Sequence, residues 1–332
     1  MASVGALAQT ASGTNAIALG ASSLASGAYS ISIGYASQAT YDYAVAMGRS
    51  SRAANNSATA LGTAATATGL NSTALGASSS ALADNATVLG YGTMAWGLNS
   101  TVMGYAASAG NQNATTVGAY SNAYGPGATA MGGYSVAGVN GSGSIVRDTA
   151  VGFYASATGG YSLALGYLAT ASNSYSVALG ARSVAGSVNS SADPAYYGFG
   201  SAAGQTARAV MSVGDSATGI YRQIQNVAAG SVSATSTDAV NGSQLNATNA
   251  AVTSLTSTVS SNDIAINARV DSTNSTVTAL TSTVSSNNSA VNARVDATNS
   301  SVTALTSTVS SNDIAINARV DSTNSTVTAL TS

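Results

Sequence analysis

Residues 71–79 read Asn-Ser-Thr-Ala-Leu-Gly-Ala-Ser-Ser, and their central phrase (small, β-branched, small, apolar, glycine) returns at every fourteenth position through the first two thirds of the chain. The glycine of this phrase stands at Gly20, Gly34, Gly48, Gly62, Gly76, Gly90, Gly104, Gly118 and Gly132. The register then jumps by twenty positions to Gly152, resumes at Gly166 and Gly180, jumps by twenty again to Gly200 and closes at Gly214. Two six-residue insertions therefore interrupt an otherwise strict array.

Each repeat alternates residue types ahead of its glycine. The residue before Gly76 is apolar (Leu75), and two positions earlier stands Thr73, at a position that is mostly β-branched. This alternation predicts a short strand whose β-branched and apolar side chains face inward, and the glycine permits a tight corner. A fourteen-residue coil suits two short strands per turn. The sequence therefore predicts a parallel β-roll, a rod of about 65 Å if its coils stack at about 4.8 Å.

Composition limits what this roll can be. Of 332 residues only 6% are charged and 6% aromatic, so the core must be thin and built from small residues. The net charge of −2 provides no field that would attract nucleic acid or an anionic membrane. His and Cys are absent and the Asp residues are scattered, so we expect neither a zinc site nor a calcium loop. A thin roll with exposed strand edges is expected to pack side by side with identical copies.

Two other uses of a β-solenoid are disfavoured. An enzyme would need clustered carboxylates or bases in a cleft, and the sparse Asp residues predict that the chain is not an enzyme. An ice-binding solenoid would need an outward row of threonines. The repeat threonines are instead expected to face inward, namely Thr59, Thr73, Thr87, Thr101, Thr115 and Thr129.

A second, twenty-five-residue repeat begins after about residue 250. The run from Val252 to Val259 recurs nearly unchanged from Val277, Val302 and Val327. The core candidates of one unit are Val252, Leu255, Val259, Asn262, Ile266, Val270 and Thr273. Their spacing averages about 3.57 residues per turn, which predicts a nearly straight coiled coil. Its Val and Ile seam with polar layers suits a trimer at least as well as a dimer.

The stretch between the two repeats carries the phrases Gln-Asn-Val-Ala-Ala-Gly at 225–230 and Asp-Ala-Val-Asn-Gly-Ser-Gln-Leu at 238–245. It closely resembles the neck of trimeric autotransporter adhesins, the YadA-like family of Gram-negative surface fibres. The order of head repeat, neck and stalk resembles the family over essentially the whole chain, although family heads more often carry Val and Ile where Thr73 and Leu75 stand. The residues that match the neck motif are Asn226, Val227, Asp238, Ala239, Val240, Asn241, Gln244 and Leu245.

This resemblance implies a homotrimer with a mainly β head and a coiled coil. The expected parts are a left-handed parallel β-roll head over 1–221, a neck over 222–250 and a parallel trimeric coiled-coil stalk over 251–332. The family begins with a secretion signal and ends in an outer-membrane β-barrel. Neither is present here, so we expect this chain to be part of a longer cell-surface protein.

The function implied is adhesion by the head to host matrix, host cells, surfaces or other bacteria, with the stalk as a spacer. The alternative is a structural fibre or phage-type tail spike without a dedicated receptor. No cofactor is expected except chloride in the stalk core. By analogy with the family, Asn262, Asn287 and Asn312 point inward and coordinate it, or else form a water-filled Asn layer.

The remaining signals lie on side chains outside the predicted core. Tyr residues recur in register, and parallel stacking predicts the pairs Tyr91–Tyr105, Tyr29–Tyr43 and Tyr161–Tyr175 as ladders. They either stabilise the roll or form a receptor face of Tyr91, Tyr105, Trp96, Arg49 and Arg52, because aromatic residues and Arg dominate interface hot spots. Arg269 with Asp271, and the copies of this pair, either bridge chains beside the seam or are solvated charges.

Overall fold

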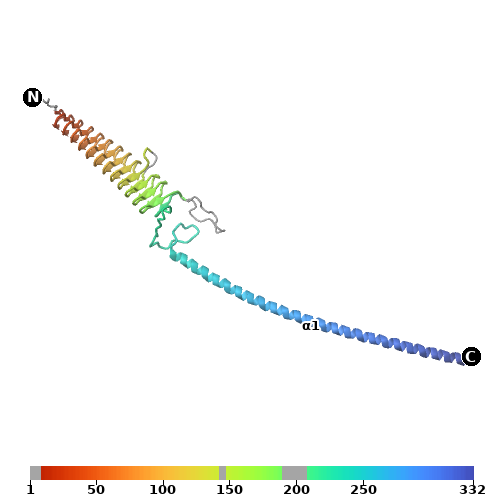
Figure 1. The fold of residues 1–332 in the computed structure, drawn as a ribbon. Coiled ribbons are helices and arrows are strands. Elements are labelled where there is room, and N and C mark those ends of the chain that lie inside the picture. The colour runs from red at the N-terminus through yellow and green to blue at the C-terminus, as the bar shows by residue number, and fades with distance from the viewer. Residues whose placement is uncertain (1–8, 142–146, 189–207) are drawn as a thin grey trace. The chain divides into compact units, whose positions relative to one another are not determined.

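Two separate units make up the computed structural model, which describes residues 9–141, 147–188 and 208–332. The units are Met1–Ala239 and Val240–Ser332, and each is described by itself. The first contains a parallel β-solenoid in which every coil contributes one strand to each of two 13-stranded sheets, called here sheet A and sheet B. The second is a single long helix (Figure 1). The predicted fold class, a β-roll followed by a helical stalk, is confirmed.

Sheet A is built from two-residue strands. They are β1 (Thr10–Ala11), β3 (Leu24–Ala25), β5 (Gln38–Ala39), β7 (Arg52–Ala53), β9 (Thr66–Ala67), β11 (Ser80–Ala81), β13 (Met94–Ala95), β15 (Ser108–Ala109), β17 (Asn122–Ala123), β19 (Val136–Ala137), β21 (Ser156–Ala157), β23 (Thr170–Ala171) and β25 (Val184–Ala185). Such short strands fit the fourteen-residue coil.

Sheet B is built from three-residue strands, apart from the last. They are β2 (Ile17–Leu19), β4 (Ile31–Ile33), β6 (Val45–Met47), β8 (Thr59–Leu61), β10 (Thr73–Leu75), β12 (Thr87–Leu89), β14 (Thr101–Met103), β16 (Thr115–Val117), β18 (Thr129–Met131), β20 (Thr149–Val151), β22 (Leu163–Leu165), β24 (Val177–Leu179) and β26 (Met211–Ser212). Pairing joins equivalent residues of successive coils, as in Thr73 with Thr87. Each repeat position therefore forms a row along the roll.

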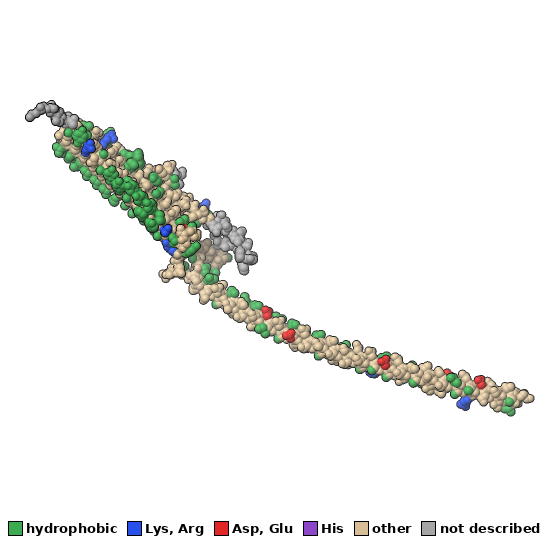
Figure 2. Space-filling view, viewed as in Figure 1, with side chains coloured by type: hydrophobic (Ala, Val, Ile, Leu, Met, Phe, Trp, Pro, Cys, Tyr) green, Lys and Arg blue, Asp and Glu red, His purple; other side chains and the backbone are tan. Residues whose placement is uncertain are grey.

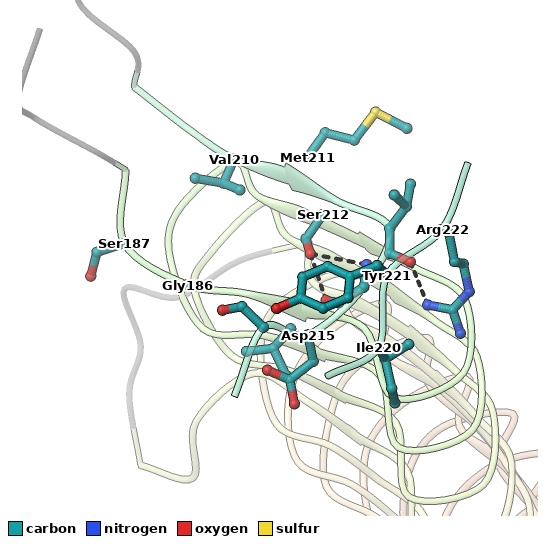
Figure 3. Close-up of a pocket in the computed structure, with 13 residues that line it drawn as sticks. Gly186, Ser187, Val210, Met211, Ser212, Asp215, Ile220, Tyr221 and Arg222 are labelled. Carbon is teal, nitrogen blue, oxygen red and sulfur yellow. Dashed lines mark hydrogen bonds between the residues drawn. The ribbon is translucent and has the colours of Figure 1, made fainter. Parts of the chain in front are cut away.

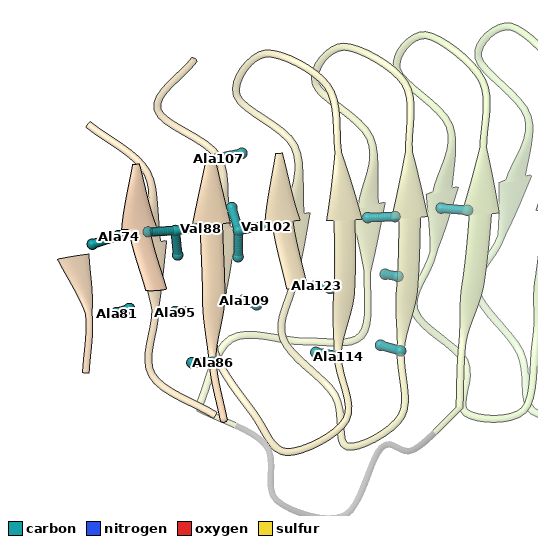
Figure 4. Packing of buried hydrophobic residues seen from close by; sticks show 14 of the residues in the cluster. Ala74, Ala81, Ala86, Val88, Ala95, Val102, Ala107, Ala109, Ala114 and Ala123 are labelled. Carbon is teal, nitrogen blue, oxygen red and sulfur yellow. The ribbon is translucent and has the colours of Figure 1, made fainter. Parts of the chain in front are cut away.

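The structure reverses the predicted faces of the sheet B strands. The middle residue points inward, as Ala74 does with 0% exposure, whereas Thr73 and Leu75 point outward and Leu75 is 38% exposed. The reason is the small cross-section of a closed fourteen-residue coil, whose interior receives only four side chains. Every sheet A strand ends in Ala, and the largest fully buried apolar side chains are Val88 and Val102 (Figure 4). The predicted thin core of small residues is confirmed.

The repeat threonines face outward, so the reason given above against an ice-binding surface, inward threonines, does not hold. The threonine row lies beside a row of large apolar side chains, such as Leu75 and Leu89, on the outer side of sheet B. This outer side, the sheet B face, therefore alternates hydroxyl and apolar groups. Figure 2 shows hydrophobic side chains gathered along the roll. An apolar row of this length is typical of a surface that packs against protein.

The repeat glycine has the role that the sequence predicts for it. Gly76 has φ +137°, and a Cβ built on it would lie 2.3 Å from the carbonyl oxygen of Gly90 in the next coil. Any side chain here would hold adjacent coils apart. Ser79 then donates its hydroxyl to the Gly76 carbonyl over 2.8 Å, so the polar group beneath the corner is satisfied.

The second interruption of the repeat differs from the prediction. Strand β24 pairs directly with β26, with Val177 opposite Met211, so the step to the next coil is thirty-four positions rather than fourteen. In the described part of the chain Gly180 is therefore followed in register by Gly214, and the insertion is twenty residues long instead of six. The predicted coil at Gly200 lies outside the described residues.

The helix α1 (Gly242–Thr331) has 90 residues, or about 135 Å at about 1.5 Å per residue. Asn241 is its N-cap, and none of its side chains is buried. The helix thus begins inside the segment predicted as the neck. The predicted boundaries at 221 and 250 remain predictions.

Candidate functional site

Two turns border the sheet B face in every coil, and each carries a row of exposed side chains. The turn after the strand contributes the first two residues that follow each repeat glycine, and we call this row the glycine edge. The turn before the strand contributes the residue two positions ahead of it, and we call this row the asparagine edge. Because coils stack in register, equivalent positions on each edge lie one coil apart.

The glycine edge carries a continuous aromatic ladder. Ring centroids lie 5.3 Å apart for Tyr91 and Tyr105, 5.2 Å for Tyr105 and Tyr120, 5.0 Å for Tyr120 and Tyr134, and 4.8 Å for Tyr134 and Tyr154. A hydrogen bond with Tyr105 raises the pKa of the Tyr120 phenol above its ordinary value of 10.0. The predicted stacking of Tyr91 on Tyr105 is confirmed.

The rest of this ladder is not predicted from the sequence repeat, because its rings change position within the repeat. Tyr91 and Tyr105 directly follow the glycine, whereas Tyr120, Tyr134 and Tyr154 come one residue later. The position directly after the glycine is small in two of these three coils, as Gly133 shows, and Phe153 occupies it in the coil of Tyr154. A Cβ on Gly133 would lie 3.0 Å from the ring of Phe153. Searching for aromatic residues at either position would have found the ladder.

The asparagine edge carries a ladder of side-chain amides. Asn71 donates to Asn85, Asn85 to Asn99 and Asn99 to Asn113, with N–O distances of 3.3, 3.1 and 3.3 Å. All four have φ between +53° and +56°, a left-handed conformation that Asn tolerates well.

In several other coils the same edge carries an aromatic or basic side chain. Tyr29 stacks on Tyr43 at 5.5 Å, and Tyr161 on Tyr175 at 5.3 Å, as predicted. The Arg147 guanidinium lies 5.8 Å from the centroid of the Tyr161 ring, within the range of a cation–π contact.

The structure does not gather the five residues of the predicted receptor face. Tyr91 and Tyr105 lie together on the glycine edge, and Arg49 lies on the same edge three coils earlier. Arg52 lies on strand β7, and Trp96 follows strand β13, at the end of that strand away from Tyr91. Trp96 is 57% exposed. Its position beside sheet A separates it from the sheet B face.

Asp148 is a buried acid at a repeat position that is otherwise mostly Ala or Ser. Its Oδ1 accepts hydrogen bonds from the Gly160 and Ser162 amides, both over 2.9 Å, and from the Ser162 hydroxyl over 2.7 Å. Within the described residues its Oδ2 is buried without a hydrogen-bond partner. These bonds tie the coil that follows the first interruption to the next coil. The sequence signal for Asp148 is an acidic residue at a repeat position that is otherwise mostly Ala or Ser.

Arg222 closes the last described coil. Its guanidinium donates to the carbonyl of Val213 (Figure 3). It also donates to the Ala181 carbonyl over 2.6 Å and to the Ser183 hydroxyl over 3.2 Å. The groove at this end has a volume of about 530 Å³, and its lining includes Met211 and Arg222. Arg222, predicted as the first residue of the neck, thus binds the carbonyls left at the end of the roll.

A short turn lies beside this cap. Asp215 and Ile220 pair through two backbone hydrogen bonds of 2.8 Å. The Thr218 hydroxyl donates to the Asp215 carboxylate over 2.6 Å, and the Ala217 amide donates to it over 3.0 Å. These two bonds lower the pKa of Asp215 below its ordinary value of 3.8.

The predicted neck motif supplies the cap of the helix. The Asn241 side chain accepts from the Gln244 amide, and the Gln244 side chain accepts from the Asn241 amide, both over 3.2 Å. This capping box satisfies amides that have no partner inside the helix. Earlier in the motif, the Asp238 carboxylate accepts from the Ser231 amide over 2.9 Å.

The stalk helix exposes its predicted seam. Val259 and Val270 are each 50% exposed, and a groove of about 370 Å³ is lined by Ile266, Val270 and neighbouring residues. Equivalent grooves recur one repeat unit apart, around Val295 and Val320. The predicted anion-coordinating residues Asn262, Asn287 and Asn312 lie on this helix at the same spacing of one repeat unit.

A metal site would need clustered ligating side chains, and a membrane span would need a long apolar helix. Within the described residues, no group of three or more His, Cys, Asp or Glu side chains gathers in a way that could hold a metal ion. Nor does any described helix combine the length and apolar character that crossing a bilayer requires.

Comparison with known proteins finds relatives for both repeats. Residues 223–268 match the family described as the coiled stalk of trimeric autotransporter adhesin. The YadA head domain repeat matches residues 11–37, 39–65, 67–93, 146–169 and 157–183. A stretch of 68 residues, 20% of the chain, is 53% identical to autotransporter adhesin BtaE of Brucella suis biovar 1. The match spans only 8% of that relative's length.

Two solved structures are also similar. The C-terminal YadA-like domain of BPSL2063 from Burkholderia pseudomallei is 40% identical over 31% of this chain and 48% of its own, with a TM-score of 0.29. The collagen-binding domain of Yersinia adhesin YadA is 25% identical over 68% of this chain and 84% of its own, also with a TM-score of 0.29.

Proposed function

We propose that this chain, which belongs to the YadA-like family of trimeric autotransporter adhesins, attaches a bacterium to host matrix, host cells, surfaces or other bacteria through its head. The observation that carries the proposal is the order of the parts, with head repeats followed by the family's stalk at 223–268. Membership of an adhesin family points to a non-enzymatic role. It also supports a location at the outer-membrane surface, with the stalk as a spacer.

The working unit we propose is a homotrimer. One chain leaves the apolar row of the sheet B face exposed, and it exposes every apolar side chain of α1. Both surfaces recur at fixed spacing, once per coil in the roll and once per repeat unit in the helix, so identical chains can pair along their whole length. Three heads would then multiply weak contacts with a receptor.

The receptor contact we propose lies on the sheet A side of the roll. Burying the sheet B face between copies leaves the sheet A side to solvent, and Trp96 and Arg52 are exposed there. Trp and Arg are enriched among the residues that dominate binding energies. Replacing Trp96 by Ala should weaken attachment about tenfold or more, whereas replacing the nearby exposed Leu98 by Ala should change it little.

Attachment assays test where adhesion resides. Bacteria that display the whole protein are compared with bacteria that lack residues 1–221, on collagen, fibronectin, laminin and whole cells. We expect deletion of the head to abolish attachment to at least one of these. Unchanged attachment would contradict a head adhesin. A trimer that attaches to none of them would favour the alternative, a structural fibre without a receptor.

We also propose that the stalk core binds chloride at Asn262, Asn287 and Asn312. In a trimer, three side-chain amides at each layer would direct N–H donors toward the axis, where an anion can accept them. Crystals grown in bromide should show axial anomalous peaks at the three layers. Layers without a peak would mean that the amides bond to water and serve only to specify register.

A further inference from the structure

The two edges of the sheet B face carry complementary side chains at the same height along the roll. Three arginines occupy edge positions in the described coils, and each stands across its own strand from an aromatic residue. The pairs are Arg49 with Tyr43 across β6, Arg147 with Tyr154 across β20, and Arg182 with Tyr175 across β24. The arginine lies on the glycine edge in two pairs and on the asparagine edge in one. Wherever one edge carries an arginine, the other edge of the same coil therefore carries an aromatic residue, whichever edge the arginine is on.

These pairs are too far apart to meet within one chain. Tyr43 and Arg49 lie in the turns on either side of the extended strand Val45–Met47, whose three residues alone span about 10 Å at about 3.3 Å each. The strand holds the two side chains at opposite edges, so their complementarity has no use inside the monomer.

The aromatic partners present free ring faces. Tyr43 and Tyr175 are the most exposed tyrosines of the coils, at 61% and 62%. Each is the last ring of a two-ring stack, on Tyr29 and Tyr161 respectively, so one face of each remains outside the stack. A guanidinium stacks favourably on such a face. Arg147 over Tyr161 shows that an edge arginine of this roll can do so.

The middle coils are complementary in a different way. The amide ladder of the asparagine edge stands opposite the tyrosines of the glycine edge, coil by coil, and we call the side chain that one coil contributes to a ladder a rung. The facing pairs are Asn85 with Tyr91, Asn99 with Tyr105 and Asn113 with Tyr120. Phenol hydroxyls and amides are mutual hydrogen-bond donors and acceptors. Both rows repeat once per coil, so one rung of each can meet one rung of the other.

A cyclic trimer brings these edges together. Its interfaces are heterologous, meaning that one patch of a subunit contacts a different patch of the next. Rotation about an axis parallel to the roll leaves every residue at its own height. If the sheet B face lines that axis, the glycine edge of one copy therefore meets the asparagine edge of the next at the same rung.

We propose that the two edges form a seam between copies of this chain, in which Arg49 and Arg182 stack on Tyr43 and Tyr175 of the next copy and the tyrosine ladder bonds to the amide ladder. This inference rests on the homotrimer of the proposed function. The seam pairs residues of the same coil, because cyclic symmetry keeps the three chains at one height. It also assigns Tyr91, Tyr105 and Arg49 to assembly, which leaves Trp96 and Arg52 for a receptor.

Cysteine cross-linking of the full chain tests the seam, because the sequence contains no Cys. Tyr43→Cys and Arg49→Cys are combined in one chain and treated with a short bis-maleimide that cannot span the strand within one chain. Head-to-tail contact links each copy to the next, so the expected product is a covalent trimer on a denaturing gel. The matched control combines Tyr43→Cys with Arg52→Cys, whose second site is on sheet A, and should remain monomeric.

Three results are informative. A covalent trimer from the first pair and none from the control supports the seam. A native trimer by sedimentation in which the first pair stays monomeric overturns the seam and leaves the homotrimer standing. A chain that sediments as a monomer before any substitution overturns the homotrimer itself, and with it the seam.

A second pair guards against a local folding defect. Tyr175→Cys with Arg182→Cys lies at the other end of the roll and should give the same covalent trimer. Circular dichroism before cross-linking shows whether each variant is folded. If both folded pairs fail to cross-link in a native trimer, the edges do not meet.

Discussion

At the scale of single residues, this roll is decided by what fits inside a coil. Ala81 ends a sheet A strand with 0% exposure, and its neighbour Ser80 points outward from the same strand. The two residues share a backbone environment and differ in the face that they occupy. A substitution at each position therefore separates the effect of the interior from the effect of the strand.

Ala81→Leu should destabilise the head by about 1–3 kcal/mol, because three added carbons must enter an interior that has no room for them. Ser80→Leu should change the free energy of unfolding by about 0.5 kcal/mol or less. Denaturant unfolding of both variants measures the difference. Equal stability of the two would mean that the interior is not closely packed.

The repeat glycine provides a second prediction. Gly76→Ala would place a Cβ 2.3 Å from a carbonyl oxygen of the next coil, at φ +137°, and should cost about 2 kcal/mol or more. Gly92→Ala is the matched control, since φ there is +63° and no atom lies within 4 Å of the added Cβ. We expect a cost of about 1 kcal/mol for it. Thermal unfolding should rank Gly92→Ala above Gly76→Ala.

At the scale of elements, the ends of the roll need groups that the repeat does not supply. Inside the array every strand pairs with the coils on both sides, but the last coil leaves carbonyls without a following strand. Arg222 donates to two of them, and the turn from Asp215 to Ile220 lies beside it. The N-cap box of Asn241 and Gln244 does the same for the first amides of α1.

This turn should depend on pH through Asp215. Its pKa is lowered in the folded chain, so ionisation contributes stability that is fully present above the unfolded value of 3.8. The contribution is lost as the pH falls through the lowered pKa. The protection factor of the Ile220 amide, the exchange rate of an unprotected amide divided by its own, should therefore fall below about pH 4 in the native chain. In Asp215→Asn this fall should be absent, and its persistence would assign the effect to another group.

At the scale of the whole molecule, the proposed homotrimer predicts the mass of the particle in solution. Three chains of 32.0 kDa should sediment together at about 96 kDa. The head and the helix each expose an apolar surface along their length, so either could hold the trimer alone. A variant of the stalk is therefore best judged by the unfolding of its own helix.

Ile266→Asp should lower the temperature at which helical circular dichroism is lost by about 5 °C or more, because it places a charge in the predicted seam. Ile264→Asp is the matched control in the same turn, and its side chain lies outside the seam set. In the single chain both isoleucines are exposed, at 53% and 71%, so the comparison reports on contacts between chains. Equal shifts would contradict the seam assignment.

The sequence alone determined the period of both repeats, their order and the class of fold. A fourteen-residue period leaves room only for short strands, and a twenty-five-residue period with steps of three and four fits a helix. It also predicted that Tyr91 stacks on Tyr105, because residues one period apart in a parallel solenoid stack in register.

Only the tertiary structure decided which side of each strand is inside. Alternation at Thr73, Ala74 and Leu75 defines two faces but does not orient them, and the larger residues were expected inside. The closed coil is too narrow for them, so Ala74 fills it and Leu75 faces out. The structure likewise decided that Gly214 follows Gly180 in register, that the tyrosine ladder continues through Tyr120, and that Asp148 is buried. Each depends on which coils stack, and that is set by packing between residues distant in the chain.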